Sequence, residues 1–222
     1  MNFKNNLKNN LENSFENNCK KCQKDAHCCI FKKNVGFTFV GIKDAKRIKQ
    51  LIKKDYDYFL DYSPVSKEIV VCLKNCDPAL EGALRYSQLD KHNNILRLKT
   101  KKDGRCIFLD KQNHCDIYSI RPNICRIYPF WAVELIDGKI KVIPHDIQSK
   151  CGVIKSLVKR QNNEQKEKEI DEILSREEKS EIKKIFKQIK MEDLFYKKNI
   201  IKFIKDNDLI KDNSFIKDKK QN

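Results

Sequence analysis

The most informative stretch of this chain runs from Cys115 to Phe130 and reads Cys-Asp-Ile-Tyr-Ser-Ile-Arg-Pro-Asn-Ile-Cys-Arg-Ile-Tyr-Pro-Phe. Its two prolines, Pro122 and Pro129, stiffen the loop that carries Cys125. Pro129 also forbids a long helix through the stretch, because proline removes a backbone donor and restricts the residue before it. The segment therefore predicts a stiff loop that presents a thiol.

Arg121 and Arg126 flank the Cys125 thiol in this loop. Their guanidinium groups could offset thiolate charge or donate hydrogen bonds to sulfur and carbonyl oxygen. Surface salt bridging is the alternative, and for Arg126 the sequence leaves both open. The aromatic side chains nearby are expected to pack as core over the site rather than to form a substrate cage. They are Tyr118, Tyr128, Phe130 and Trp131.

The 222 residues include ten cysteines but only six glycines, which are scattered along the chain. The glycines form no GxGxxG turn, Walker A loop or GxSxG elbow, so ordinary nucleotide-dependent chemistry is not expected. Cys19 and Cys22 lie at C-x2-C spacing in a polar stretch, where two thiols can turn onto one ion. Disulfides are not expected, because no secretory signal is visible and a cytoplasmic, reducing location is predicted.

The adjacent Cys28 and Cys29 would point to opposite faces of an extended backbone, which suits two ions or a polynuclear cluster. One ligand beside a spectator thiol is the alternative. With the later cysteines we predict eight thiolates, enough for two four-thiolate zinc sites, a bridged pair or an iron–sulfur cluster. The predicted ligands are Cys19, Cys22, Cys28, Cys29, Cys106, Cys115, Cys125 and Cys151.

Other donors are expected to play smaller parts. Zinc and iron both stay open as the bound metal, since four thiolates suit either. The histidines are expected to be surface groups or to support the ligands; they are His27, His92, His114 and His145. Cys72 and Cys76 are interpreted as one buried and one exposed thiol, with spare ligands as the alternative. C-x3-C begins the radical S-adenosylmethionine signature, but the third cysteine that this signature needs is missing.

These motifs closely resemble the cysteine-cluster family named for YkgJ, the CxxCxxCC or zinc- or iron-chelating domain. The resemblance covers Cys19 to Gly152 and includes the C-x2-C with its trailing Cys-Cys, the G-x-C-x-F-L segment at Gly104, and the Cys115 to Phe130 stretch. One departure is the gap of five residues, Gln23 to His27, before the double cysteine. The resemblance implies metal chelation. Some relatives are labelled flagellin lysine N-methylases, so a protein-lysine N-methylase is the alternative, although no glycine-rich cofactor loop is seen. Whether the chain is an enzyme stays open.

The predicted fold class is α+β. Residues 19–155 are expected to form a small cysteine-rich, metal-centred domain with short β-hairpins and helices. Residues 1–18 are expected to be a polar tail. Residues 156–222 are expected to form charged amphipathic helices, because the composition of this region is dominated by lysine, glutamate and isoleucine. Apolar residues at helical spacing support that last assignment.

Local patterns predict individual elements. A helix is expected to start at Asp44, as its cap, and to run to about Asp61. The apolar run from Glu68 to Leu73 and the alternating segment from Ile95 to Thr100 predict strands. Hairpin turns are predicted at Asp103-Gly104, just before Cys106, and at Asp137-Gly138.

The formal net charge of +16 and a pI near 9.3 raise the question of a nucleic-acid partner. Residues 160–222 hold 17 basic and 14 acidic side chains, so most of the excess lies with the cysteines. Two zinc ions on eight thiolates would lower the total to about +12. Aromatic residues are not interleaved with the basic ones, so nucleic-acid binding is not favoured. The expected partners are a metal ion and, through the C-terminal helices, a protein. No apolar run is long enough for a membrane helix.

Overall fold

The structure is a computed structural model, and it describes residues 26–31, 37–76, 81–144, 151, 154 and 174–209. The predictions for residues 1–18, Cys19, Cys22 and His145 concern residues outside these ranges. Helices and strands are mixed, with two small antiparallel sheets and a C-terminal helix, which confirms the α+β class. The elements are η2 His27–Cys29, α2 Ile42–Ile52, α3 Tyr56–Phe59, β1 Leu60–Pro64, α4 Lys67–Lys74, α5 Glu81–Ser87, β2 Asn94–Leu98, η3 Tyr118–Ile120, α6 Asn123–Ile127, β3 Phe130–Glu134, β4 Ile140–Pro144 and α9 Arg176–Asp206.

Each sheet has two antiparallel strands. β3 pairs with β4 from Phe130↔Pro144 to Glu134↔Ile140, and its turn contains Gly138 at φ 75. That left-handed conformation is the one glycine adopts without steric cost, so the predicted hairpin at Asp137-Gly138 is confirmed. β1 pairs with β2 from Leu60↔Leu98 to Pro64↔Asn94, although α4 and α5 separate the two strands in the chain.

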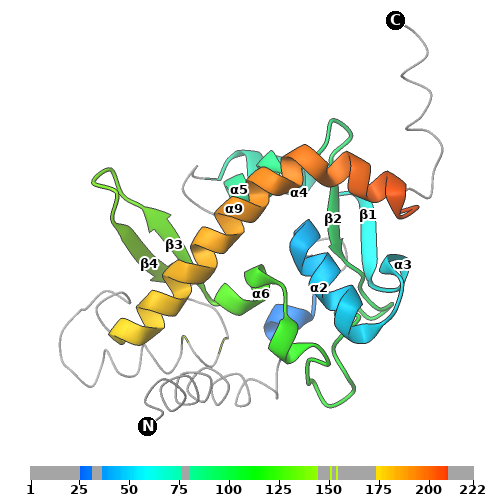
Figure 1. Cartoon of the computed structure of the whole chain (residues 1–222), viewed down its shortest axis with the longest axis horizontal. Helices are drawn as coiled ribbons and strands as arrows, with labels where there is room; N and C mark the ends of the chain where they lie inside the picture. The colour runs from blue at the N-terminus through cyan, green and yellow to red at the C-terminus, as the bar shows by residue number, and fades with distance from the viewer. Residues whose placement is uncertain are drawn as a thin grey trace, which may run out of the picture.

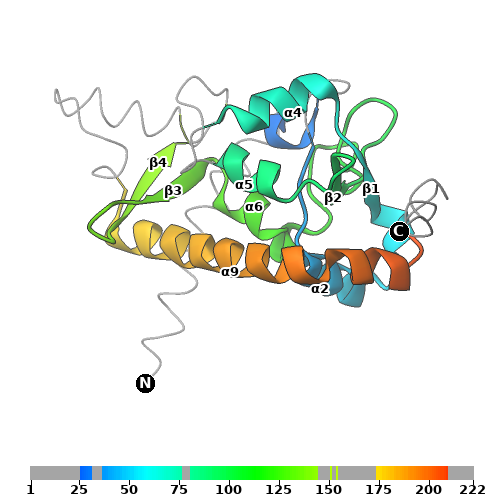
Figure 2. The ribbon, with the colours of Figure 1, turned by 90° about the horizontal axis from the view of Figure 1, so that it is seen from above.

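The long helix α9 lies along one side of the other elements (Figure 1, Figure 2). It begins with a capping box, in which the Ser175 hydroxyl accepts from the Glu178 N–H and the Glu178 carboxylate accepts from the Ser175 N–H. Its first half lies beside β3, β4 and α6, and α2 lies alongside its second half. Within the described residues no helix is both long and apolar enough to cross a bilayer.

Two apolar clusters sit on the inner face of α9. The first core is built around α2, β1 and β2, and the second around α6, β3 and β4. The first core comprises Ala26, Phe37, Phe39, Val40, Ile42, Ala45, Ile48, Tyr56, Phe59, Leu60, Tyr62, Val65, Ile95, Leu96, Leu98, Cys106, Phe108, Leu109, Ile117, Tyr196, Ile200, Phe203, Ile204 and Leu209. The second core comprises Ile124, Ile127, Phe130, Trp131, Ala132, Val142, Cys151, Ile154, Leu174, Ile182, Ile185, Phe186 and Ile189.

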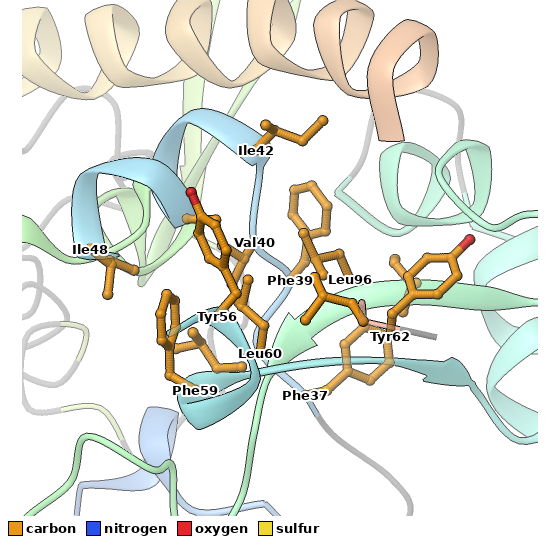
Figure 3. Close-up of a cluster of buried hydrophobic side chains, with 14 of the residues drawn as sticks. Phe37, Phe39, Val40, Ile42, Ile48, Tyr56, Phe59, Leu60, Tyr62 and Leu96 are labelled. Carbon is orange, nitrogen blue, oxygen red and sulfur yellow. The ribbon is translucent and has the colours of Figure 1, made fainter. Parts of the chain in front are cut away.

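Side chains from helices and strands meet in the first core (Figure 3). Ile42 and Ile48 come from one face of α2, while Leu60 and Leu96 come from the paired strands. Tyr196 of α9 closes this core, because its hydroxyl accepts a hydrogen bond from the Leu96 N–H at 3.1 Å. A buried tyrosine needs such a partner for its polar end, so this bond ties α9 to β2.

The predicted helix from Asp44 to Asp61 is wrong at both ends. α2 starts at Ile42, so Asp44 lies in its first turn and is not its cap. The helix stops at Ile52 because Lys53 adopts a left-handed φ of 51 and donates its N–H to the Lys49 carbonyl. Tyr56 and Phe59, the later apolar positions of the predicted helix, belong to α3, and its last two residues belong to β1.

The predicted strand from Glu68 to Leu73 is helix α4 instead. Ser66 caps it by accepting a hydrogen bond from the Ile69 N–H at 3.4 Å. A short apolar run fits a strand and a helix equally well by periodicity, and the serine before it was the deciding signal. Helical geometry buries Leu73 and leaves Cys72 exposed, so Cys72 is not the buried thiol that the sequence predicted.

Candidate metal centre

Four of the predicted ligand thiols come together from four separate segments. Cys28 lies in η2, Cys106 follows the turn at Gly104, Cys115 precedes η3, and Cys125 lies in α6. We call these four residues the thiol cluster. The Cys28 sulfur is close enough to raise the pKa of each of the other three thiols, and Cys106 and Cys115 both raise that of Cys125. Across the described residues, no group of three or more Cys, His, Asp or Glu side chains is arranged so that it could hold a metal ion.

The turn before Cys106 brings it to the η2 segment. The Cys106 N–H donates to the Cys29 carbonyl at 2.7 Å, and the Phe31 N–H donates to the Gly104 carbonyl at 2.9 Å. Gly104 has φ 83, and a Cβ there would lie 2.3 Å from the Phe31 oxygen. Only glycine therefore permits this approach, which supports the predicted turn at Asp103-Gly104.

A second tight loop fixes the spacing between Cys106 and Cys115. Leu109 forms a bridge with Cys115, and the Asp110 N–H donates to the His114 carbonyl at 2.9 Å. The Asp110 carboxylate accepts from the Gln112 and His114 N–H groups, at 2.8 and 2.7 Å. The exposed His114 ring faces Asp110 at 3.3 Å, in keeping with the surface role expected for the histidines.

Burial favours the protonated form of Cys106, Cys115 and Cys125 when no cation is bound. Loss of solvation raises the pKa of Cys106 to about 11 and raises that of Cys125 well above the ordinary value. Mutual repulsion adds to the effect, since each thiolate disfavours ionisation of its neighbours. A bound cation would reverse this balance, because metal ligation deprotonates cysteine. A set of four thiols fits zinc and iron equally in its chemistry.

Arg121 is a positive group beside the cluster. It lowers the pKa of both Cys115 and Cys125, against the effect of burial. Its guanidinium carbon lies 3.9 Å from the centre of the Tyr118 ring, a cation–π contact that holds it in place. This placement is the one expected if Arg121 offsets thiolate charge.

Arg126 forms a salt bridge, which was the alternative role expected for it. Its guanidinium binds Glu181 of α9 at 3.2 Å and the Asn123 side-chain oxygen at 3.3 Å. It therefore ties α6 to α9 by a salt bridge. Phe130 and Trp131 are buried in the second core and Tyr128 packs against it, which agrees with their expected packing role.

The thiols outside the cluster, Cys29, Cys76 and Cys151, occupy different surroundings. Cys28 and Cys29 lie in a 3-10 turn and not in an extended segment, so their sulfur atoms are 3.7 Å apart and do not point to opposite faces. Two thiolates on a tetrahedral zinc ion with 2.3 Å bonds lie about 3.8 Å apart, so this pair can share one ion. Cys151 is buried in the second core. Cys76 is half-buried and its thiol lies 3.2 Å from the Cys72 carbonyl.

Sequence reasoning missed two buried carboxylates behind the cluster. Asp44 of α2 accepts a hydrogen bond from the Asn123 N–H at 2.8 Å, at the start of the helix that carries Cys125. Glu192 of α9 accepts from the backbone of α2. Asp44 lies four residues before Ile48 and Glu192 three residues after Ile189, so each is at helical spacing from a buried apolar residue. That spacing is the signal for such contacts, because charged residues are rarely buried unless paired.

Comparison with known proteins agrees with these features. The uncharacterized protein MJ0661 of Methanocaldococcus jannaschii is 47% identical over 45 residues, which are 20% of this chain and 24% of that protein. The match thus spans about a quarter of the relative's length. No solved structure matches the chain significantly. The model of the family described as "CxxCxxCC: Putative zinc- or iron-chelating domain" matches residues 18–167, about two thirds of the chain. The chain therefore belongs to the CxxCxxCC family.

Proposed function

We propose that the chain is a cytoplasmic metal-binding protein that chelates zinc or an iron–sulfur cluster through its cysteine thiolates. The ligands are the eight thiols predicted above, and the thiol cluster forms one site. Cys29 lies beside this site and is available to it or to a second one. The zinc- or iron-chelating family of the chain supports the class of ligand.

The convergence of four thiols is the observation that carries the proposal. Cysteines used only as small apolar side chains would have no reason to meet from four segments, because free thiols pack like any small hydrophobe. Here each thiolate would repel the next, and Arg121 lies beside two of them. Such an arrangement is useful when a cation joins the sulfurs. A zinc ion would supply a structural cross-link, and an iron–sulfur cluster would supply electron transfer.

The test is elemental analysis of protein purified without oxygen, with a visible absorption spectrum of the same sample. Cys28→Ser is the informative variant, because Cys28 is exposed and its loss does not disturb a core. Cys72→Ser is the matched control, since Cys72 is also exposed but lies on α4 outside the cluster. Metal content should fall in the first variant and stay at the wild-type level in the second.

Two results would overturn the proposal. One is a folded, metal-free wild-type protein. The other is unchanged metal content in folded Cys28→Ser and Cys125→Ser proteins, which would remove both residues from the ligand set. A colourless protein with zinc would identify zinc sites, and a brown protein with iron and matching sulfide would identify a cluster.

A further inference from the structure

The N-terminus of α2 is capped by a side chain from α9. Gly41, at the cap position, has no side chain of its own to offer. Glu192 takes this role: its Oε1 accepts hydrogen bonds from the N–H groups of Lys43 at 2.7 Å and Asp44 at 3.1 Å. These are among the backbone donors that a helix start leaves unpaired, and a carboxylate there also meets the positive end of the helix dipole. A Cβ on Gly41 would lie 2.3 Å from the Glu192 carboxyl carbon, so glycine makes room for the cap.

The same arrangement is repeated between α2 and α6. α6 starts after Pro122, which offers no side-chain cap. The Asp44 Oδ2 atom accepts from the Asn123 N–H at 2.8 Å, and Oδ1 binds the Arg47 guanidinium at 2.7 Å. Arg47 in turn donates to the Arg121 carbonyl oxygen at 2.7 Å. Two residues on α2 thus hold the backbone on both sides of Pro122.

Glu192 also reaches α6 directly. Its Oε2 accepts from the Asn123 side-chain nitrogen at 3.4 Å, so one carboxylate contacts two helix starts. Asp44 is 3% exposed and Glu192 is 5% exposed. Burying two carboxylates side by side costs solvation and adds repulsion, and apolar residues of similar size would often be more stable. A use other than stability would explain why this network is present.

We propose that Glu192 and Asp44 are positioning residues for the metal centre, acting through α2 and α6 on Cys125 and on the backbone of Arg121. Glu192 fixes the start of α2, and Asp44 with Arg47 fixes the loop and helix that present the thiol and the guanidinium. Groups behind the ligands that fix their orientation commonly affect metal affinity. Glu192 lies outside residues 18–167, so the C-terminal helix completes the centre of the family domain.

The metal-related part of this inference rests on the proposed function, but the placement of Cys125 does not. The experiment therefore measures alkylation of individual thiols in metal-free protein by mass spectrometry, alongside metal release to a chelator from the loaded protein. Glu192→Ala removes the cap, and Glu177→Ala is the control, because Glu177 is an exposed glutamate on the same helix. Circular dichroism establishes that each variant is folded.

We expect Glu192→Ala to raise the alkylation rate of Cys125 relative to that of Cys106 about tenfold, since unpaired helix donors favour local opening. Metal release should accelerate in the same variant, and Glu177→Ala should match the wild type in both. General destabilisation would instead raise the alkylation rates of Cys106 and Cys125 together, because Cys106 lies in the first core. An unchanged ratio of the two rates overturns the inference.

Glu192→Gln covers the case in which the alanine variant does not fold. Its amide oxygen still accepts from α2, but its nitrogen cannot accept from Asn123, so the ratio should rise by about threefold. A wild-type ratio in this folded variant would overturn the inference equally well. If the wild-type protein binds no metal, the proposed function fails, while the alkylation ratio still decides whether Glu192 positions Cys125.

Discussion

Both cores pack against helix α9, and a short buried polar segment of this helix separates them. The first half of the helix buries Ile182, Ile185, Phe186 and Ile189 in the second core; the other half buries Tyr196, Ile200, Phe203 and Ile204 in the first. Between them lie Glu192 and Asp193, both buried. Glu192 caps α2, and Asp193 accepts from the Gln88 side-chain nitrogen at 2.6 Å. The carboxylates thus mark the line where the two cores join.

The thiol cluster lies across the same line. Cys106 belongs to the first core, and Cys125 packs against the second. The first core is rich in aromatic rings, whereas the second is smaller and depends on the first half of α9 for one side. A metal bound by the cluster would link the two cores, just as α9 does. Buried polar groups and thiols, and not a continuous apolar core, therefore lie where the two apolar halves of the molecule meet.

The largest effect is expected from Phe59→Ala in the first core. Phe59 is fully buried, with its ring centre 5.7 Å from that of Phe108 and 6.0 Å from that of Tyr56. The cavity should lower the free energy of unfolding by about 3–5 kcal/mol, measured by chemical denaturation. Because α9 joins both cores, backbone amides of β3 and β4 should exchange hydrogen faster as well.

Phe186→Ala is the reciprocal variant in the second core. Its ring meets Trp131 edge-on at 5.3 Å, and its removal should cost about 3 kcal/mol. Amides of β1 and β2 should then exchange faster too. Wild-type exchange in the pair of strands remote from each substitution would contradict the expectation that the cores unfold together.

A smaller effect is expected from pH at the line between the cores. Burial first, and the neighbouring Glu192 second, raise the pKa of Asp44 to about 7, while Arg47, the Asn123 N–H and Arg126 act in the opposite direction. The folded protein thus holds a proton that the unfolded chain loses at lower pH. Its free energy of unfolding should therefore fall as pH rises from about 4 to about 7.

Asp44→Asn measures this contribution by difference. A tenfold change in proton affinity corresponds to about 1.4 kcal/mol, so the wild type should lose about 2–4 kcal/mol relative to the variant across this range. Denaturation curves of both proteins at each pH give the value, and loss of metal at low pH is common to both. Parallel stability profiles would show that Asp44 keeps an ordinary pKa.

The smallest effect is expected on the outer face of α9. Leu194 is 64% exposed, so Leu194→Ala should change the free energy of unfolding by less than about 0.5 kcal/mol. Ile200→Ala, on the inner face of the same helix, should cost about 2–4 kcal/mol. Similar losses for both variants would mean that the outer face is covered. That face also carries Met191 and Ile201, and a protein partner for it stays a prediction.

Local patterns predicted those parts of the fold that depend on a few adjacent residues. The Asp137-Gly138 turn and the strand near Ile95 were found because their backbone and side-chain requirements are local. α4 was mistaken for a strand because an apolar run of that length satisfies both periods. α2 ends earlier than predicted, since nothing in the sequence pattern indicates that the backbone of Lys53 adopts a left-handed conformation.

In the candidate site, too, some features depend on neighbouring residues and others on contacts between distant segments. The sequence by itself predicted which residues would bind a metal, because thiols at close spacing in polar loops have few other uses. Which of the thiols meet was decided by tertiary structure, since Cys28 and Cys125 are far apart in the chain and their approach depends on the Gly104 turn and on α6. Glu192 lies 149 residues from its hydrogen-bond partner Lys43, and contacts at that distance leave no periodic trace in a sequence. Spacing specifies the chemistry of the donors, and packing of distant elements specifies their geometry.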